Sequence, residues 1–529
     1  MHRRRRMFGL FVIALAMIGA PATAQGAAPT NTKALEDAVA VGTGTTGIRK
    51  HLRQLQVIAD TSGNNGTRAT GTQGHLDSVA YVKSELAKDS DYWNVSEQPF
   101  SADIFHELAA PNLVANPAAS PAWVVNQDYA TMEFSGAGSG SGAQIAIIDF
   151  VLPTTKASTS SAGCEDTDFP AGPTSLAGKF AVIQRGTCDF GLKAINAEHH
   201  GAAGVLIFNE GTIGDPDRNG PIGGTIGGYG VTIPTLESTY AVGKYLVDHP
   251  NATIDFFANG QTETVQTMNV IAESKSGRSD RVVISGAHLD SVPAGPGIND
   301  DGSGTSTQLE VAHQMAELNI NLRNKVRFIW FSGEEQGLFG STFNADSLTK
   351  AERGSVIAML DFDMLASPNF ALQIYDGDGS EFGVAGPNGS GNIEKVFQDF
   401  FNAKGKYTER IAFDGRSDYD EYTTVGIPAG GITTGAEVHK TPFQQTKWGG
   451  VVSNTLAGQF DPCYHLACDS YGINGHPDNI NDEALDIMSD AVANAVLTFA
   501  QTTSATNGTG KGSPGATKPY DWKGNKLRK

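Results

Sequence analysis

Between Asn269 and Ala500, apolar strand-like runs alternate with helical patterns, and no other feature of the sequence constrains the fold so strongly. Three runs are almost continuously apolar: residues 281–287, 326–331 and 355–362. Residues 306–318, between the first two, repeat apolar side chains at helical spacing. Strands that are apolar on both faces and alternate with helices form a buried, mostly parallel sheet. We therefore predict an α/β fold with a mostly parallel mixed sheet flanked by helices.

Side chains of the kinds that bind metals follow each of these three strands. In chain order they are His288, Asp290, Asp300 and Asp301; then Glu334 and Glu335; then Asp361 and Asp363. The carboxyl ends of parallel strands lie at one edge of an open α/β sheet, where ligands bind. So many carboxylates at one edge would repel each other unless a cation lay among them. The sequence therefore predicts a metal centre at this edge.

The N-terminus has the three parts of a secretory signal peptide. Arg3–Arg6 are basic, residues 7–20 are apolar, and residues 22–24 read Ala-Thr-Ala, a cleavage signal. A membrane anchor is the disfavoured alternative, because a bilayer span needs roughly 20 apolar residues. We expect residues 1–24 to be removed and the mature protein to be secreted, with no membrane partner.

Charge and cysteine content narrow the function classes further. The net charge of −19 argues against a nucleic-acid partner, which would require clustered positive charge. The four cysteines read as two disulfides in an oxidising compartment. Chain order suggests pairing Cys164 with Cys188 and Cys463 with Cys468. A cysteine zinc site is disfavoured, because the pairs lie far apart and neither has the C-x-x-C spacing.

Several ordered motifs between about Arg68 and Ala500 resemble a known family. They are Gly286-Ala-His288-Leu-Asp290, Asp300-Asp301-Gly302, Gly333-Glu334-Glu335, Asp361-Phe-Asp363, Gly415-Arg416-Ser-Asp418 and Asp461-Pro-Cys463-Tyr464-His465. Together they resemble the secreted co-catalytic double-zinc aminopeptidases, which are leucyl aminopeptidase-like zinc exopeptidases. A further stretch, residues 178–209, resembles a protease-associated (PA) domain, which one subgroup of this family carries as an insertion.

The resemblance implies roles for individual residues. Two zinc ions per chain would be held by five ligands, with Asp300 bridging them: His288, Asp300, Glu335, Asp363 and His465. Glu334 would be the general base, and Tyr464 would polarise the carbonyl or stabilise its oxyanion. Arg416 would position the substrate near its amino terminus, and Asp290 would hydrogen-bond the second ring nitrogen of His288. The Asp300–Asp301 peptide bond is expected to be cis by the same resemblance.

The resemblance also suggests how the chain is divided. We predict a signal peptide (1–24), a first catalytic part with a short leader (25–124), an inserted β-rich α+β PA domain (125–262), a second catalytic part (263–501) and a disordered tail (502–529). The Cys463–Cys468 disulfide would lock the loop that carries Tyr464 and His465. Some relatives bind calcium near the positions of Asp486 and Asp490, for which an exposed helix face is an equally good interpretation.

The predicted function is a secreted, monomeric metallo-aminopeptidase that acts on peptide or protein N-termini. Three alternatives stay open at this point. Two are enzymes on a similar scaffold, a dizinc carboxypeptidase and a glutaminyl cyclase, and the third is a non-catalytic PA-domain binding protein. The complete ligand set and the base argue against the last, because non-catalytic relatives lose such residues.

Overall fold

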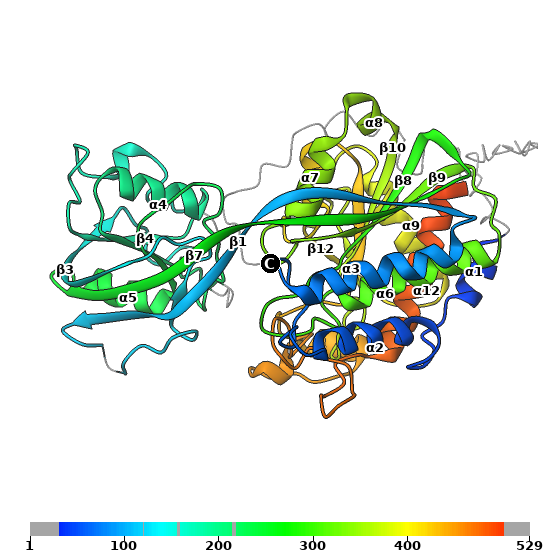
Figure 1. Cartoon of the computed structure of the whole chain (residues 1–529). Helices are drawn as coiled ribbons and strands as arrows, with labels where there is room; N and C mark the ends of the chain where they lie inside the picture. The colour runs from blue at the N-terminus through cyan, green and yellow to red at the C-terminus, as the bar shows by residue number, and fades with distance from the viewer. Residues whose placement is uncertain (1–30, 120, 156–158, 214–217, 502–529) are drawn as a thin grey trace, which may run out of the picture.

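A long antiparallel ribbon joins two unequal parts of the molecule (Figure 1). Its strands, β1 (Trp93–Asn116) and β7 (Thr253–Ser274), pair from Trp93 opposite Ser274 to Asn116 opposite Thr253. The computed structural model describes residues 31–119, 121–155, 159–213 and 218–501. The predicted signal peptide and the predicted disordered tail both lie outside these residues. Among the residues that are described, no helix is both long and apolar enough to cross a membrane.

The larger unit is built on the predicted mixed, mostly parallel sheet. Its strand order is β12-β11-β13-β10-β8-β9-β7. The strands not yet given are β8 (Arg278–His288), β9 (Asn324–Phe331), β10 (Val356–Phe362), β11 (Gln373–Tyr375), β12 (Glu409–Ile411) and β13 (Ala429–Thr433). The three central strands predicted from the sequence are β8, β9 and β10, and they run parallel to one another. β7 pairs antiparallel with β9, and β11 pairs antiparallel with β13, which makes the sheet mixed.

Helices cover both faces of this sheet, which explains why its strands are apolar throughout. On β8, Val283 faces one core and Val282 and Ile284 face the other, because successive side chains of a strand point to opposite faces. The first core is completed by α1 (Thr32–Ala38), α2 (Gly47–Asp60), α3 (Gln73–Leu86), α6 (Gly302–Glu317), α9 (Ser390–Ala403) and α12 (Asp482–Gln501). The second core is covered by α7 (Phe339–Ser347), α8 (Lys350–Ser355) and α10 (Asp420–Thr424). A short helix, α11 (Pro442–Trp448), has no fully buried residue, and its Trp448 packs against the first core.

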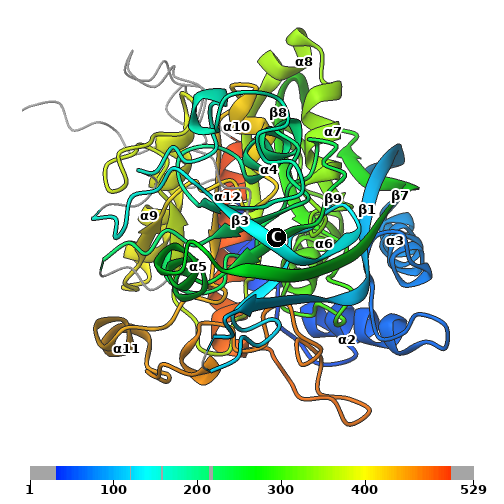
Figure 2. The ribbon, with the colours of Figure 1, turned by 90° about the vertical axis from the view of Figure 1, so that its left-hand side faces the viewer.

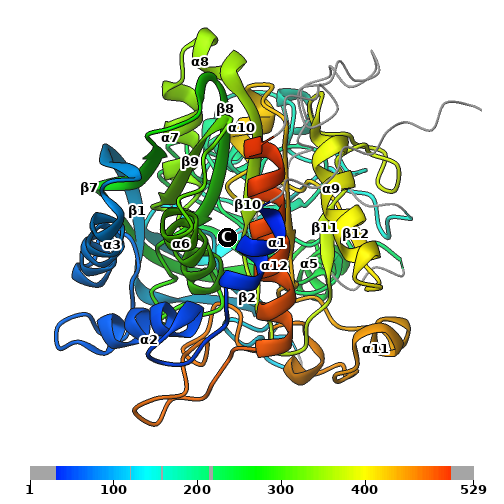
Figure 3. The same ribbon diagram turned by 90° about the vertical axis from the view of Figure 1, so that its right-hand side faces the viewer.

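One helix boundary and the N-terminal leader differ from the prediction. The helix expected at residues 306–318 begins at Gly302, because the Asp301 side chain accepts a hydrogen bond from Gly304 N and caps the helix there. Part of the expected leader is the helix α1, whose Leu35 is fully buried. Figure 3 shows α1 beside α12, to which it is joined by a hydrogen bond from Asn494 to Glu36. Residues 32–38 are therefore part of the larger unit's core.

In the smaller unit the sheet continues from β7, which pairs antiparallel with β3, in the order β3-β4-β5-β6-β2. The strands are β2 (Tyr129–Thr131), β3 (Gly138–Ile148), β4 (Phe180–Gln184), β5 (Gly204–Phe208) and β6 (Thr235–Ser238). Helix α4 (Phe190–His199) covers one face and α5 (Tyr240–Asp248) the other. The Gly- and Ser-rich segment from residue 135 runs into β3, where a Cβ on Gly140 would lie 2.4 Å from the Phe256 ring. That close approach requires glycine at this position.

The strand directions place the carboxyl edge of the main sheet on the side of the smaller unit. β9 runs antiparallel to β7, so its carboxyl end points back along the ribbon. β8 and β10 are parallel to β9 and end at the same edge. Figures 1 and 2 show the smaller unit on this side of the larger one.

Candidate metal centre

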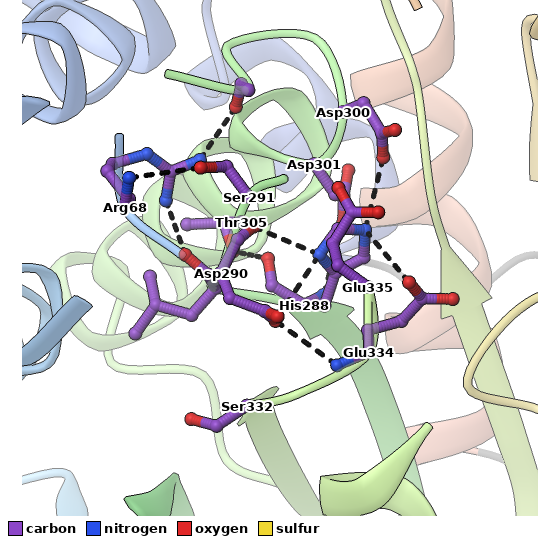
Figure 4. A network of polar contacts seen from close by, with 12 residues as sticks. Arg68, His288, Asp290, Ser291, Asp300, Asp301, Thr305, Ser332, Glu334 and Glu335 are labelled. Carbon is purple, nitrogen blue, oxygen red and sulfur yellow. Dashed lines mark hydrogen bonds and ion pairs between the residues drawn. The ribbon is translucent and has the colours of Figure 1, made fainter. Parts of the chain in front are cut away.

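The ends of three strands and the start of one helix bring the predicted ligands together, and Figure 4 shows three of them, His288, Asp300 and Glu335, beside Glu334. His288 is the last residue of β8, Asp363 directly follows β10, and Asp300 lies two residues before α6. Glu334 and Glu335 follow β9 after Ser332 and Gly333. His465 comes from a distant loop and lies 3.0 Å from Glu335 Oε2. All five predicted ligands therefore lie at one edge of the sheet.

These side chains form two groups that share Asp300. In the first, His288 Nε2 lies 3.2 Å from Asp300 Oδ1 and 3.8 Å from Asp363 Oδ1. In the second, His465 Nε2 lies 3.2 Å from Asp300 Oδ2. Within each group, one candidate ligand atom per residue lies within 4.8 Å of the others. Asp300 contributes one oxygen to each group, as expected of a carboxylate that bridges two ions.

The unmet hydrogen-bonding capacity of these atoms fits a pair of cations. Asp300 Oδ2, both Glu335 oxygens, Asp363 Oδ1 and His465 Nε2 are buried and form no hydrogen bond. Burial alone would lower the pKa of His465, but Glu335 and Asp300 raise it to about 10. The carboxylates thus create a strongly negative local field. Two imidazoles with three carboxylates are the nitrogen and oxygen donors that Zn²⁺ takes in proteins, so the residues fit zinc.

Asp290 differs in detail from its predicted role. The Nδ1 atom of His288 lies 3.2 Å from the backbone carbonyl oxygen of Asp290 and 3.7 Å from its carboxylate Oδ1. The second distance is too long for a hydrogen bond. Asp290 Oδ1 instead accepts from the backbone N–H of Glu334 at 3.3 Å. Asp290 therefore fixes His288 through its main chain and ties β8 to the Glu334 loop through its side chain.

Other buried polar side chains hold the centre without belonging to the predicted set. The Asp300–Asp301 peptide bond is cis, as predicted. Asp301 accepts hydrogen bonds from the backbone N–H groups of His288 and Met364 at 3.2 and 3.1 Å. Asp469 accepts from the backbone N–H of Asp300 at 3.0 Å. These carboxylates fix the backbone on both sides of the shared ligand.

A buried arginine anchors the loop between His288 and Asp300. Arg68 is fully buried and donates hydrogen bonds to three backbone carbonyls, those of Leu289, Pro296 and Gly297. The bonds to Pro296 and Gly297 are both 2.7 Å long. Burial lowers the pKa of Arg68 to about 10, which still leaves it charged at neutral pH. Arg68 was recognised in the sequence only as the start of the family resemblance, because its partners are backbone atoms.

The loop that carries His465 also carries Tyr464 and is closed by a disulfide. Both predicted disulfides, Cys164–Cys188 and Cys463–Cys468, are present. The Tyr464 ring stacks on the His465 ring, with centroids 3.8 Å apart. Arg416 Nη2 donates to the Tyr464 hydroxyl at 3.2 Å. The two residues predicted to contact the substrate therefore contact each other.

Sequence reasoning missed Glu437, which accepts a 2.7 Å hydrogen bond from Arg416 Nη1. Glu437 follows strand β13 by four residues. The signal was available, because the same argument from strand ends that found the ligands applies to β13. A cavity of about 560 Å³ has Glu334, Arg416, Glu437, Tyr464 and three of the five ligands, Asp300, Asp363 and His465, among its lining residues.

At the predicted calcium site, Asp490 contacts a lysine. Lys404 Nζ lies 2.5 Å from Asp490 Oδ2 and 3.6 Å from Glu36 Oε2. A lysine ammonium therefore supplies the positive charge between these carboxylates. Calcium binding stays a prediction.

Comparison with known proteins assigns the family. The sequence model of Peptidase family M28 matches residues 269–496, and that of the PA domain matches residues 149–246. An aminopeptidase of Pseudomonas aeruginosa PAO1 is 42% identical over 84% of this chain and 78% of that protein. A leucine aminopeptidase 2 of Trichophyton rubrum is 36% identical over 85% of this chain and 83% of that protein.

The fold agrees with this assignment. The aminopeptidase from Aneurinibacillus sp. strain AM-1 superposes with a TM-score of 0.65 at 23% identity, covering 89% of this chain and 96% of that one. A zinc aminopeptidase from Bacillus subtilis gives 0.57 at 21% identity, over 87% and 97% of the two chains. The chain therefore belongs to peptidase family M28, the zinc aminopeptidases, in the form that carries an inserted PA domain.

Proposed function

We propose that this aminopeptidase removes N-terminal residues from peptides with two zinc ions per chain, and that Glu334 is its general base. The observation that carries the proposal is the pair of ligand groups that share Asp300, next to a buried carboxylate that belongs to neither. His288, Asp300 and Asp363 would hold one ion, and Asp300, Glu335 and His465 the other. When bound, zinc would polarise the scissile carbonyl and make water nucleophilic at neutral pH.

Glu334 is suited to move the proton. Its side chain lines the cavity, and Glu334 Oε2 lies 4.0 Å from His288 Nε2, so it sits beside the first ligand group. It would accept a proton from the attacking water and pass it to the leaving amine. The backbone N–H of Glu334 is held by Asp290, which restricts where the carboxylate is presented.

Tyr464 and Arg416 would stabilise the developing oxyanion. Arg416 donates to the Tyr464 hydroxyl oxygen, so the hydroxyl proton stays available for an oxygen of the substrate. Glu437 holds the guanidinium from its other side. The three residues form a chain of charge-assisted hydrogen bonds that fixes the hydroxyl before substrate arrives.

The charge of the cavity favours a free amino terminus. Several carboxylates line it, among them Glu334, Asp363 and Glu437. An α-ammonium or α-amine would bind among them, whereas an internal peptide bond brings no such group. We further propose that the enzyme is secreted and acts as a monomer on peptide or protein N-termini. The signal-peptide pattern and the two disulfides support secretion.

The test compares leucine p-nitroanilide with its N-acetyl form. We expect hydrolysis of the first alone. Equal hydrolysis of both would contradict the requirement for a free amine, and hydrolysis of neither would contradict the activity itself. Amidation of the C-terminus of a short peptide should leave its rate of hydrolysis unchanged, whereas a carboxypeptidase would require the free C-terminus. Conversion of an N-terminal glutamine to a ring without hydrolysis would instead indicate a cyclase.

A further inference from the structure

The lining of the cavity extends from the metal centre along the edge of the sheet and includes Glu409, a carboxylate that no catalytic step uses. Phe362 of β10 pairs with Ile432 of β13, which puts Asp363 beside Thr433. Thr433 pairs with Gln373, and Gln373 pairs with Glu409. Asp363, Thr433, Gln373 and Glu409 all line the cavity. Three strand spacings of about 4.8 Å separate the backbones of Asp363 and Glu409 by about 14 Å.

Two neutral amides fix the Glu409 carboxylate. Gln373 Nε2 donates to Glu409 Oε1 at 2.8 Å, and Gln444 Nε2 donates to both oxygens at 2.8 and 2.9 Å. The orientation of the Gln444 amide is set by a capping box, in which its Oε1 accepts from Thr441 N at 2.8 Å. Its amino group must therefore face Glu409. The carboxylate is held in place before any substrate arrives.

No cation of the described residues forms an ion pair with this carboxylate. Among the described residues, no lysine, arginine or histidine nitrogen lies within 4.0 Å of it. The neighbouring Arg410 pairs with Glu394 instead. Lys440 is buried and donates to the backbone carbonyls of Phe370 and Gly449 at 2.7 and 3.1 Å. Burial lowers the pKa of Lys440 to about 8, and the negative charge of Glu409 acts on it from beyond ion-pair distance to oppose that shift. Glu409 is half-buried, so a cation that reached it would be attracted more strongly than on the open surface.

The lining of the cavity also includes apolar side chains. Met364, Tyr375 and Ile411 are among its lining residues and offer apolar or aromatic surface, and Arg410, which also lines it, is paired with Glu394. A ligand that fits both the walls and the end must combine an apolar stem with a terminal positive charge. Lysine has this form, with a flexible four-carbon stem and an ammonium, and arginine is similar.

We propose that Glu409 forms the end of the pocket for the side chain of the substrate's first residue, and that it selects N-terminal lysine and arginine. This rests on the aminopeptidase function proposed above. The α-amine of that residue is held at the metal end, and its side chain leaves the same carbon atom. The stem then runs past Thr433, whose small side chain leaves the way open to Glu409.

The decisive comparison uses lysine p-nitroanilide and norleucine p-nitroanilide, which share the four-carbon stem and differ only in the ammonium. We expect the wild-type enzyme to show a kcat/KM about 10- to 100-fold higher for lysine, since a hydrogen bond to a charged group is worth that much. Equal values for the two substrates would overturn the proposal. Absence of hydrolysis of both, and of leucine p-nitroanilide, would instead overturn the aminopeptidase function.

The variant Glu409→Gln tests the residue itself. It should lower kcat/KM for lysine and arginine p-nitroanilides about 10- to 100-fold. The kcat/KM for norleucine p-nitroanilide should stay within about twofold of the wild-type value. Glu381→Gln is the matched control, because it removes one negative charge from the lining of the same cavity. The lysine preference should survive in the control. A lysine preference that survives equally in both variants would contradict the assignment.

A second measurement needs no variant. L-Lysine and L-norleucine should both inhibit the wild-type enzyme as products, and lysine should have an inhibition constant about tenfold lower. If Glu409→Gln fails to fold, this comparison decides the question alone. Inhibition by norleucine that is as strong as that by lysine would reject Glu409 as the end of the pocket.

Discussion

Both units of the molecule bury charged side chains, but in the larger unit several of them are gathered at one place where their contacts are mainly with one another. In the PA domain, the buried Lys193 donates to the carbonyl of Ala162 at 2.5 Å, and His200 bonds Asp166 at 2.9 Å. The buried Glu237 accepts from the backbone of Gly223 and Gly224 at 2.9 and 2.5 Å. At the carboxyl edge of the main sheet, atoms of Asp300, Glu335, Asp363 and His465 are equally buried and form no hydrogen bond.

The difference separates a structural charge from a functional one. Burying a polar group without a partner costs free energy, so a fold keeps several such groups together only where a ligand completes them. Burial and a shifted pKa are not sufficient to identify a functional residue. Burial also lowers the pKa of Lys193, to about 7, although this lysine lies in the PA domain, away from the metal centre. The unpaired ligand atoms, rather than the buried charge, therefore mark the metal centre. Each prediction below perturbs one side of this contrast.

The largest expected effect comes from removing the metal. A strong chelator should reduce peptidase activity to background, and metal analysis of the untreated enzyme should return two zinc ions per chain. Hydrogen exchange should increase in the loop at 463–468 and stay unchanged in β4 and α4 of the PA domain. One zinc ion per chain at saturation would contradict the shared role of Asp300.

The next largest effect is expected when each of the two adjacent glutamates is replaced by glutamine in turn. Glu334→Gln should lower kcat by about 10²–10⁴-fold, because general-base catalysis contributes that much. KM and zinc content should change little, since Glu334 acts mainly in the transition state. Glu335→Gln should instead weaken one zinc site. If Glu334→Gln lost zinc while Glu335→Gln kept both ions, the two roles would be reversed.

The sequence predicted the centre well where its residues follow strands. His288, Glu334, Glu335 and Asp363 lie within four residues of the end of an apolar strand, and the parallel sheet brings those ends together. Asp300 was found by the same reasoning, although its backbone N–H is held in place by the carboxylate of Asp469, which the sequence did not single out. His465 and Tyr464 were identified by family resemblance alone, because the folded path of their loop cannot be read from local patterns.

What the sequence could not predict depends on contacts between distant segments. Arg68 acts through backbone carbonyls more than 200 residues away in the chain, which have no sequence signature. The detail at Asp290 turned on a few tenths of an ångström between its carboxylate and His288. Glu409 becomes conspicuous only when the pairing of three short strands puts it in the same cavity as Asp363. The residue types alone predicted the chemistry of the metal centre. Which other residues line the same pocket depends on the register of the strands, which the sequence does not reveal.

Removing each of the two disulfides offers a further test. We expect loss of Cys164–Cys188 to cost more stability and loss of Cys463–Cys468 to cost more activity. Cys463 and Cys468 are 5 residues apart, and Cys164 and Cys188 are 24 apart. By loop-closure entropy, the shorter loop contributes about 2 kcal/mol to the free energy of unfolding and the longer one about 3.5 kcal/mol. Serine pairs at 463 and 468 should nevertheless lower kcat/KM about 10- to 100-fold, because misplaced catalytic groups are costly.

Serine pairs at 164 and 188 should destabilise the PA domain more and leave kcat/KM within about twofold. Urea unfolding and p-nitroanilide kinetics on both double variants provide the measurement. Unchanged turnover in the first variant would remove the argument that this disulfide positions Tyr464 and His465.

The smallest expected effect is that of excising the PA domain. None of the five ligands lies within it, and the ribbon supplies a natural point of closure, because His106 and Gln261 are directly paired. Replacing residues 107–260 with Asn-Gly would close β1 and β7 as a two-residue hairpin. The apolar cluster of Phe100, Ala102, Ile104, Val265 and Phe339 would remain at the base of the ribbon. The predicted domain bounds of 125–262 would instead cut through β7.

Excision would remove the contacts of Phe134 with Phe105 and with Phe339, whose ring centroids lie 5.8 and 6.5 Å from that of Phe134. Phe339 begins α7 shortly after the glutamate loop, so this ring contact links the PA domain to the chain next to the general base. Its T-shaped geometry is worth only about 0.5–1.5 kcal/mol beyond the buried area. We therefore expect kcat/KM for small p-nitroanilides to stay within about threefold, a factor within that energy. The preference among longer peptides should change, because the PA domain lies on the side of the carboxyl edge. A folded excision variant that hydrolysed no small substrate would show that the PA domain contributes to the centre itself.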